Sequence, residues 1–199
     1  MPIDKRTRAR FTHTMHHIAF LMILLAATSC QSAPTGPAAG ATKTATDGLA
    51  PIPYTVEQVQ AAHPDGTLLR FRIVQASTEV EQHVRFENGD GEGVEVVSWS
   101  QDAAKQPINK PTKQRSLWSE LRKHASFAAA RTERKRAQCK VPAGSYECWE
   151  YVVRGANEGD PTQRFYFADD KPGPPVLLVT ERDGTELMRM ELLEYRRGR

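Results

Sequence analysis

Alternation of apolar and polar residues with a period of two constrains the fold of this chain more than any other feature of its sequence. Leu69, Phe71 and Ile73 alternate with Arg70 and Arg72. Successive side chains of a β-strand point to opposite faces, so this pattern predicts a strand with one buried face. Further candidate strands follow along the chain: Val80–Phe86, Val94–Trp99, Arg131–Val141, Tyr146–Val153, Arg164–Phe167, Val176–Arg182 and Thr185–Tyr195.

Short turn sequences join most of these segments. Asn88–Gly91 is a strong hairpin signal, and Asp183-Gly184 is typical of a two-residue type I′ turn. The second turn would pair Val179 with Met188, with the register open by a residue or two. Strands joined by short hairpins are antiparallel, so the sequence predicts an antiparallel sheet.

Two helices are expected beside the strands. Thr55 and Gln58 have the spacing of a capping box, which predicts a short helix over about 56–62. Apolar residues that include Trp118 recur at helical spacing over about 116–125 and predict an amphipathic helix.

Together these elements predict a mainly β fold of the α+β kind. We expect an antiparallel curled sheet, or half-barrel, of about seven to eight strands, with helix 116–125 as its main cover. The polar residues 101–114 would form a loop. Residues 51–199 would then make one β-rich domain.

Large apolar side chains are expected to gather on the concave face of this sheet. They would either fill an ordinary core or line a cavity for an acyl chain or another apolar ligand. The candidates are Leu69, Phe71, Val84, Phe86, Trp99, Phe165, Phe167, Val179, Met188 and Met190.

The N-terminal residues 1–29 predict an export signal. A polar, basic stretch over residues 1–17 precedes an apolar run of about eleven residues, 18–28. As a helix this run would span roughly 17 Å, well short of the ~30 Å hydrocarbon core of a membrane. Its length is typical of the apolar region of a signal peptide.

Ala27-Thr28-Ser29-Cys30 follows that run and resembles the signal of bacterial lipoproteins. The resemblance implies that Cys30 becomes the acylated N-terminus and that the protein is fastened to a membrane, with Gln31 favouring the outer membrane. The alternatives are an ordinary cleaved signal and an uncleaved anchor. Residues 30–50 are rich in small and polar residues and predict a flexible tether.

Charge argues against nucleic acid as a partner. The chain has 27 Lys and Arg residues and 24 Asp and Glu residues, but four of these bases and only one of the acids lie in residues 1–29. The rest of the chain is therefore formally neutral, without the excess of positive charge that nucleic acid binding uses.

Cys139 and Cys148 flank the turn over 142–145. A two-residue loop at Ala143-Gly144 would set the two cysteines directly opposite each other, within disulfide range. An exported compartment permits oxidation, so the sequence predicts a structural disulfide. Free thiols and a functional pair remain the alternatives.

No motif in the sequence predicts catalysis, a cofactor or a metal site. Asn88–Gly93 superficially resembles a calcium loop, but Trp99 stands where the loop needs Glu. His63, His83 and His124 are each expected at the surface, outside any catalytic arrangement. We therefore expect a protein that is not an enzyme.

The basic run Arg131–Arg136 is the strongest local charge signal. In a strand, Arg134 and Arg136 would point one way, and Glu133 and Lys135 the other. The run is either a solvated face or a contact with anionic lipid headgroups, lipopolysaccharide or acidic glycan.

Two stretches, Val141–Tyr151 and Phe165–Val176, resemble hairpins of bacterial secreted proteins and lipoproteins. Those proteins are similar in architecture to the lipoprotein-carrier superfamily, which implies a half-open antiparallel barrel with a helical lid over an apolar cavity. The resemblance concerns the fold more than the activity. Together with the lipoprotein signal, the sequence predicts a non-catalytic, membrane-anchored protein whose concave sheet holds an acyl chain or another apolar ligand. The alternative is a structural or interaction lipoprotein with a packed core that docks onto an envelope complex.

Overall fold

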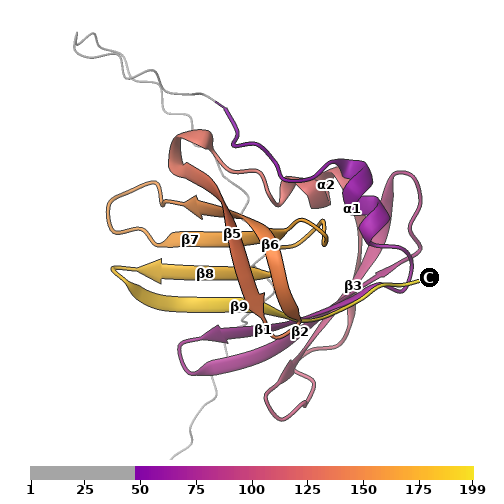
Figure 1. The fold of residues 1–199 in the computed structure, drawn as a ribbon. Helices are drawn as coiled ribbons and strands as arrows, with labels where there is room; N and C mark the ends of the chain where they lie inside the picture. Colours follow the sequence, from indigo (N-terminus) through magenta and orange to yellow (C-terminus); the bar gives the residue numbers. More distant parts are fainter. Residues whose placement is uncertain (1–47) are drawn as a thin grey trace, which may run out of the picture. The chain divides into compact units, whose positions relative to one another are not determined.

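The computed structural model describes residues 48–199 (Figure 1). The expected signal segment 1–29, the lipidation residue Cys30 and most of the expected tether lie outside the described residues. The expectations for that part of the chain therefore remain predictions.

One antiparallel sheet dominates the described residues, curled and not closed into a barrel (Figure 1). It has nine strands rather than the seven to eight expected, in the spatial order β4-β3-β2-β1-β9-β8-β7-β6-β5. β1 and β9 pair at its centre, so the first and last strands of the chain are neighbours. The strands are β1 (Leu68–Gln75), β2 (Thr78–Glu87), β3 (Gly93–Asp102), β4 (Thr112–Leu117), β5 (Thr132–Val141), β6 (Gly144–Val153), β7 (Thr162–Ala168), β8 (Leu177–Arg182) and β9 (Thr185–Arg196).

Strand β4 is the one that the sequence did not predict. It lies across the boundary between the expected loop 101–114 and the expected helix 116–125. Most of its side chains are exposed, because it is an edge strand that pairs only with β3. A strand that buries neither face needs no alternation of apolar and polar residues, so its sequence gives no sign of a strand. The pairing with β3 decides that β4 is a strand.

The two α-helices were predicted with different success. Helix α1 (Val56–Ala62) has the expected bounds, and Thr55 and Gln58 form the predicted capping box. Helix α2 (Trp118–Lys123) is shorter than the expected 116–125, and a 3₁₀ turn, η1 (Ala129–Arg131), follows before β5. Leu117 ends β4 and remains exposed, whereas Trp118 is buried.

The two faces of the sheet are covered by different parts of the chain. On one face the segment before α1 packs against β6 and β7, where the Tyr54 hydroxyl donates to the Ala168 carbonyl (2.8 Å) and Tyr151 donates to Pro51. On the other face the sheet curls, and β5 and β6 cross in front of β7 to β9 (Figure 1). The Ala143 amide at the β5–β6 turn donates to the Leu192 carbonyl of β9 (3.1 Å).

Two hairpin registers correct the predictions. Asp183 and Gly184 both have positive φ, at 50° and 75°, as a type I′ turn requires. A β-bulge follows between Thr180 and Glu181, so Val179 pairs with Arg189. The expected pairing of Val179 with Met188 is therefore wrong by one residue, and these two side chains lie on opposite faces.

In the β5–β6 hairpin the loop is Pro142-Ala143, one residue earlier than expected, because Val141 pairs with Gly144. Cys139 consequently faces Tyr146, and Cys148 faces Ala137. The predicted direct opposition of the two cysteines is wrong, and they are diagonal neighbours instead.

Candidate functional site

The structure places most of the expected cavity-lining residues in a packed core. Those with less than a tenth of their surface exposed are Leu69, Phe71, Val84, Phe86, Phe167, Val179 and Met188. Phe165 and Met190 are half-buried. Trp99 lies on the opposite face from Val84 and Phe86, because it pairs with His83 and stacks on its ring at 4.8 Å.

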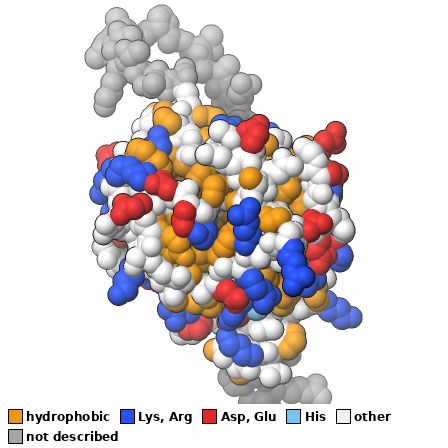
Figure 2. Space-filling model, turned by 45° about the vertical axis from the view of Figure 1, so that its right-hand side comes forward, with side chains coloured by type: hydrophobic (Ala, Val, Ile, Leu, Met, Phe, Trp, Pro, Cys, Tyr) orange, Lys and Arg blue, Asp and Glu red, His pale blue; other side chains and the backbone are white. Residues whose placement is uncertain are grey.

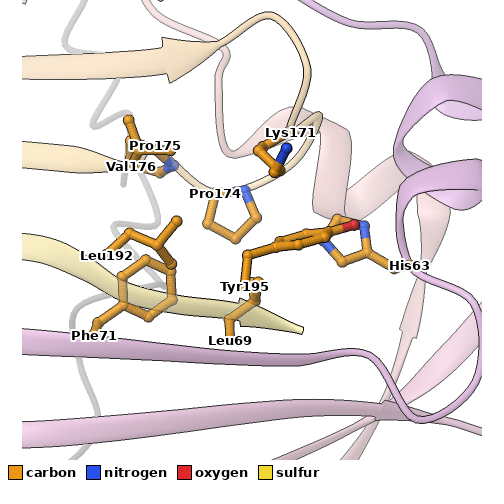
Figure 3. Close-up of a pocket in the computed structure, with 9 residues that line it drawn as sticks. All are labelled: His63, Leu69, Phe71, Lys171, Pro174, Pro175, Val176, Leu192 and Tyr195. Carbon is orange, nitrogen blue, oxygen red and sulfur yellow. The ribbon is translucent and has the colours of Figure 1, made fainter. Parts of the chain in front are cut away.

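The space left among these residues is small. Leu69, Phe71, Leu192 and Tyr195 border a void of about 10 Å³ beneath Pro174 (Figure 3). A void of about this size holds one water molecule. The concave face of β1 and β9 is therefore filled by its own side chains.

His63 belongs to this core and not to the surface. It is 2% exposed, its Nδ1 lies 2.8 Å from the Val59 carbonyl oxygen, and its ring contacts Phe86 at 4.2 Å between centroids. Burial lowers the pKa of His63 to about 4, because the charged imidazolium would lose its water. The prediction of a surface residue is wrong, since α1 and β9 both pack over the turn that holds it.

A second buried histidine, His83, lies in a cluster of charges on the opposite face of the sheet. Its Nε2 is 3.0 Å from Oε1 of Glu81, and Arg70 donates to the same oxygen at 2.8 Å. The hydrogen bond from Arg70 holds the pKa of Glu81 at about 2, and Lys105 adds a second cation. The prediction of a surface residue is also wrong for His83. The negative charge of Glu81 beside it is already balanced by Arg70 and Lys105.

A larger, polar groove opens beside β5 and the β6–β7 and β8–β9 loops, with a volume of about 340 Å³. Arg154 pairs with Glu133 at 2.6 Å, and Arg164 pairs with Glu181 at 2.7 Å. At its side the buried Glu150 accepts hydrogen bonds from Arg164 and Tyr166. The charges of this groove largely neutralise one another, which argues against a site for an ion of either sign.

The cysteine pair lies deep between β5, β6 and β9. Cys139 and Cys148 are buried free thiols. The Cys148 thiol donates to the Tyr146 carbonyl at 3.7 Å, and the neighbouring cysteine lowers the pKa of Cys139 and raises that of Cys148. The structure therefore places the predicted disulfide partners as buried neighbours on one hairpin, with no bridge between them.

The basic run of β5 meets an aromatic side chain. Arg134 and Arg136 share one face, as expected, and their guanidinium carbons lie 3.5 Å and 4.6 Å from the centroid of Trp149. Arg136 also donates to Asp169 at 2.9 Å. We call Arg134, Arg136 and Trp149 the Arg134 platform. The platform lies on β5 and its neighbour β6, at one edge of the sheet.

Two further kinds of feature were sought in the described residues, metal clusters and membrane-spanning helices. Within residues 48–199, no three His, Cys, Asp or Glu side chains are grouped to hold a metal ion. No helix in that range is long and apolar enough to cross a membrane. Basic and acidic side chains are interspersed over the face that Figure 2 shows. His124, the third histidine, lies at the C-cap of α2.

Comparison with known proteins gives a partial structural overlap. No protein-family model matches the chain, and no curated protein does. The solved structures that overlap with it include MucB with MucA(peri), MucB alone, and the Pseudomonas aeruginosa MucA/MucB complex. Their identities are 12%, 12% and 13%, and their TM-scores 0.49, 0.49 and 0.48, over 72%, 72% and 71% of this chain. The chain spans 55–57% of the length of those chains, so its function has to be sought in its own residues.

Proposed function

We propose that this chain is a lipid-anchored protein of the bacterial cell envelope whose folded part has a non-catalytic role and binds a partner protein. The observation that carries the choice of a protein partner is the packed concave face, where the void beside Leu69 and Phe71 measures about 10 Å³. An acyl chain would have to displace core side chains such as Phe71 and Leu192. Moving side chains out of a close-packed core destabilises the fold.

The anchoring part of the proposal is supported by the sequence. The basic segment, the short apolar run and Ala27–Cys30 together resemble a lipoprotein signal. Several acyl chains on Cys30 would hold the protein on a membrane nearly irreversibly, with the outer membrane facing the periplasm as the expected place. Residues 31–47 would then let the folded part reach a partner away from the bilayer surface.

Catalysis is not part of the proposal. The two buried histidines face the interior of the fold: His63 Nδ1 lies 2.8 Å from the Val59 carbonyl oxygen, and His83 Nε2 lies 3.0 Å from Glu81 without a hydrogen-bond partner. A general acid or base needs a side chain that can reach a substrate proton, and both imidazoles face core or ion-pair partners.

Site-directed photo-crosslinking in living cells tests the proposal. A photoreactive residue is placed at one of three exposed positions: Ile108 before β4, Leu187 in β9, or Gln138 in β5. We expect a discrete protein adduct at one of these positions and none at the other two. Adducts to lipid alone, or no adduct at any position, would contradict a protein-binding role.

A further inference from the structure

We propose that the outer edge of β5 is the docking site for an acidic, extended segment of the partner, which pairs with β5 as an additional antiparallel strand. This inference rests on the proposed function and names the chemistry of the partner. Three observations carry it: a free backbone edge, cations on the same residues as that edge, and an arrangement of charge that disfavours self-pairing.

The backbone edge of β5 is unpaired among the described residues. β5 is the last strand of the sheet and pairs only with β6. The Arg154 amide donates to the Arg131 carbonyl (2.9 Å). This bond shows which residues of β5 are hydrogen-bonded to β6. In an antiparallel ladder, residues bonded to the partner alternate with residues whose groups point away. The odd residues of β5 therefore bond to β6, and the even residues present their amides and carbonyls outward.

The same even residues carry the Arg134 platform. The guanidinium carbon of Arg134 lies over the Trp149 ring, and no salt bridge among the described residues includes Arg134. Its Nε is buried without a hydrogen-bond partner. Arg136 is already held by Asp169. Arg134 is thus a cation without a carboxylate partner beside an unpaired backbone, and a carboxylate on the partner strand would give its guanidinium an opposite charge.

The sign of the charge selects the partner. From Arg131 to Lys140 there are five basic residues and one acid, Glu133. Charged edges commonly prevent strands from pairing with each other. A strand with carboxylates on the face toward Arg134 and Lys140 would turn that repulsion into attraction, because opposite charges on directly paired residues stabilise a sheet.

A second copy of this chain fits the edge poorly. Antiparallel pairing of two β5 strands about Ala137 would set Arg134 of one copy opposite Lys140 of the other. Like charges directly opposite each other are destabilising. An anionic membrane surface would attract the cations as well, but it offers no amides and carbonyls to the outward edge. The free edge therefore favours an extended peptide, which uses both features.

The test uses the full chain purified with its native N-terminus and a peptide of about eight residues that alternates Thr and Glu. A peptide with Gln in place of every Glu is the matched control. The Thr/Glu peptide should slow hydrogen exchange at the amides of Arg134 and Arg136. The amide of Lys135, which is bonded to β6, should not change. Equal protection by the Gln peptide, or none by either, would overturn the proposal.

Two pairs of variants separate the backbone from the charge. Gln138→Pro removes an outward amide without breaking a bond to β6, and Gln138→Ala keeps that amide. We expect about tenfold weaker peptide binding for the first and less than about twofold for the second. Arg134→Gln should weaken binding about threefold, and Lys123→Gln, on α2, should leave it unchanged. The exchange measurement needs no variant, so it decides the question even should Gln138→Pro fail to fold.

Other occupants give distinct results. Binding to phosphatidylglycerol vesicles that depends on Arg134 but not on Gln138→Pro, without peptide binding, would overturn the proposal in favour of a membrane surface. Dimers with protected β5 amides would overturn it in favour of a second copy. A protein adduct at Ile108 or Leu187, with β5 unprotected by the peptide, would refute the edge site and leave the proposed function standing.

Discussion

Gly173 and His63 pack so closely that no side chain fits between them: a Cβ on Gly173 would lie 2.6 Å from Cε1 of the imidazole. Gly173 also has φ +139°, a conformation that other residues rarely adopt. The loop before β8 therefore packs against His63 at the end of α1. The small void shown in Figure 3 lies beside this contact.

Replacing Gly173 by Ala should destabilise the protein by about 2–4 kcal/mol, because the new methyl adds a steric clash to backbone strain. Gly159→Ala is the matched control, since Gly159 has φ +79° but nothing within 4 Å of the position that a Cβ would take. It should cost about 1 kcal/mol. Urea unfolding of the two variants measures the difference, and equal losses would show that the contact with His63 is absent.

The buried His63 makes stability depend on pH. Its pKa is about 4 in the folded protein and 6.5 when solvated. Between these values the unfolded state binds the extra proton, so the free energy of unfolding rises with pH from 4 to 6.5 and is level above that range. The contribution is up to about 3 kcal/mol. Unfolding curves of wild type and His63→Gln should converge as the pH falls, and parallel pH profiles would refute the burial.

The adjacent residues Leu117 and Trp118 should respond very differently to truncation. Trp118 is 2% exposed and its indole donates to the Asp90 carbonyl at 2.8 Å, whereas Leu117 is 45% exposed. Trp118→Ala should cost about 3–5 kcal/mol and Leu117→Ala less than about 1 kcal/mol. Chemical denaturation measures the free energy of unfolding of both variants. A large loss of stability for Leu117→Ala would support the expected helix over 116–125.

Oxidation should join Cys139 and Cys148 in exported protein. The two buried thiols are diagonal neighbours in the β5–β6 hairpin, and the bridge would close a short loop worth roughly 2–3 kcal/mol in the chain-entropy model. A thiol assay on denatured, unreduced protein should find neither cysteine reactive, while protein made in a reducing compartment should show both. Two reactive thiols in exported protein would refute the bridge.

Local rules made much of the fold predictable. Thr55 and Gln58 set the start of α1, and Asp183-Gly184 set the β8–β9 turn, because capping and turn chemistry act over a few residues. The side on which Arg134 lies also followed from the period of a strand.

Features that depend on distant partners could not be read in this way. The bulge after Thr180 and the loop at Pro142-Ala143 each shifted a register by a step that the sequence does not mark. The burial of His63 comes from β9 and the Gly173 loop, far away along the chain. The free edge of β5 became visible only once the order of the strands was known.

Native mass spectrometry of the protein released from the envelope of its host can show whether the folded part carries an apolar ligand. We expect the mass of a chain that begins at an acylated Cys30, with no lipid or other small molecule lost when the protein is denatured. A stoichiometric lipid or other apolar ligand that leaves on denaturation would contradict the packed core and, with it, a role based on binding a protein partner.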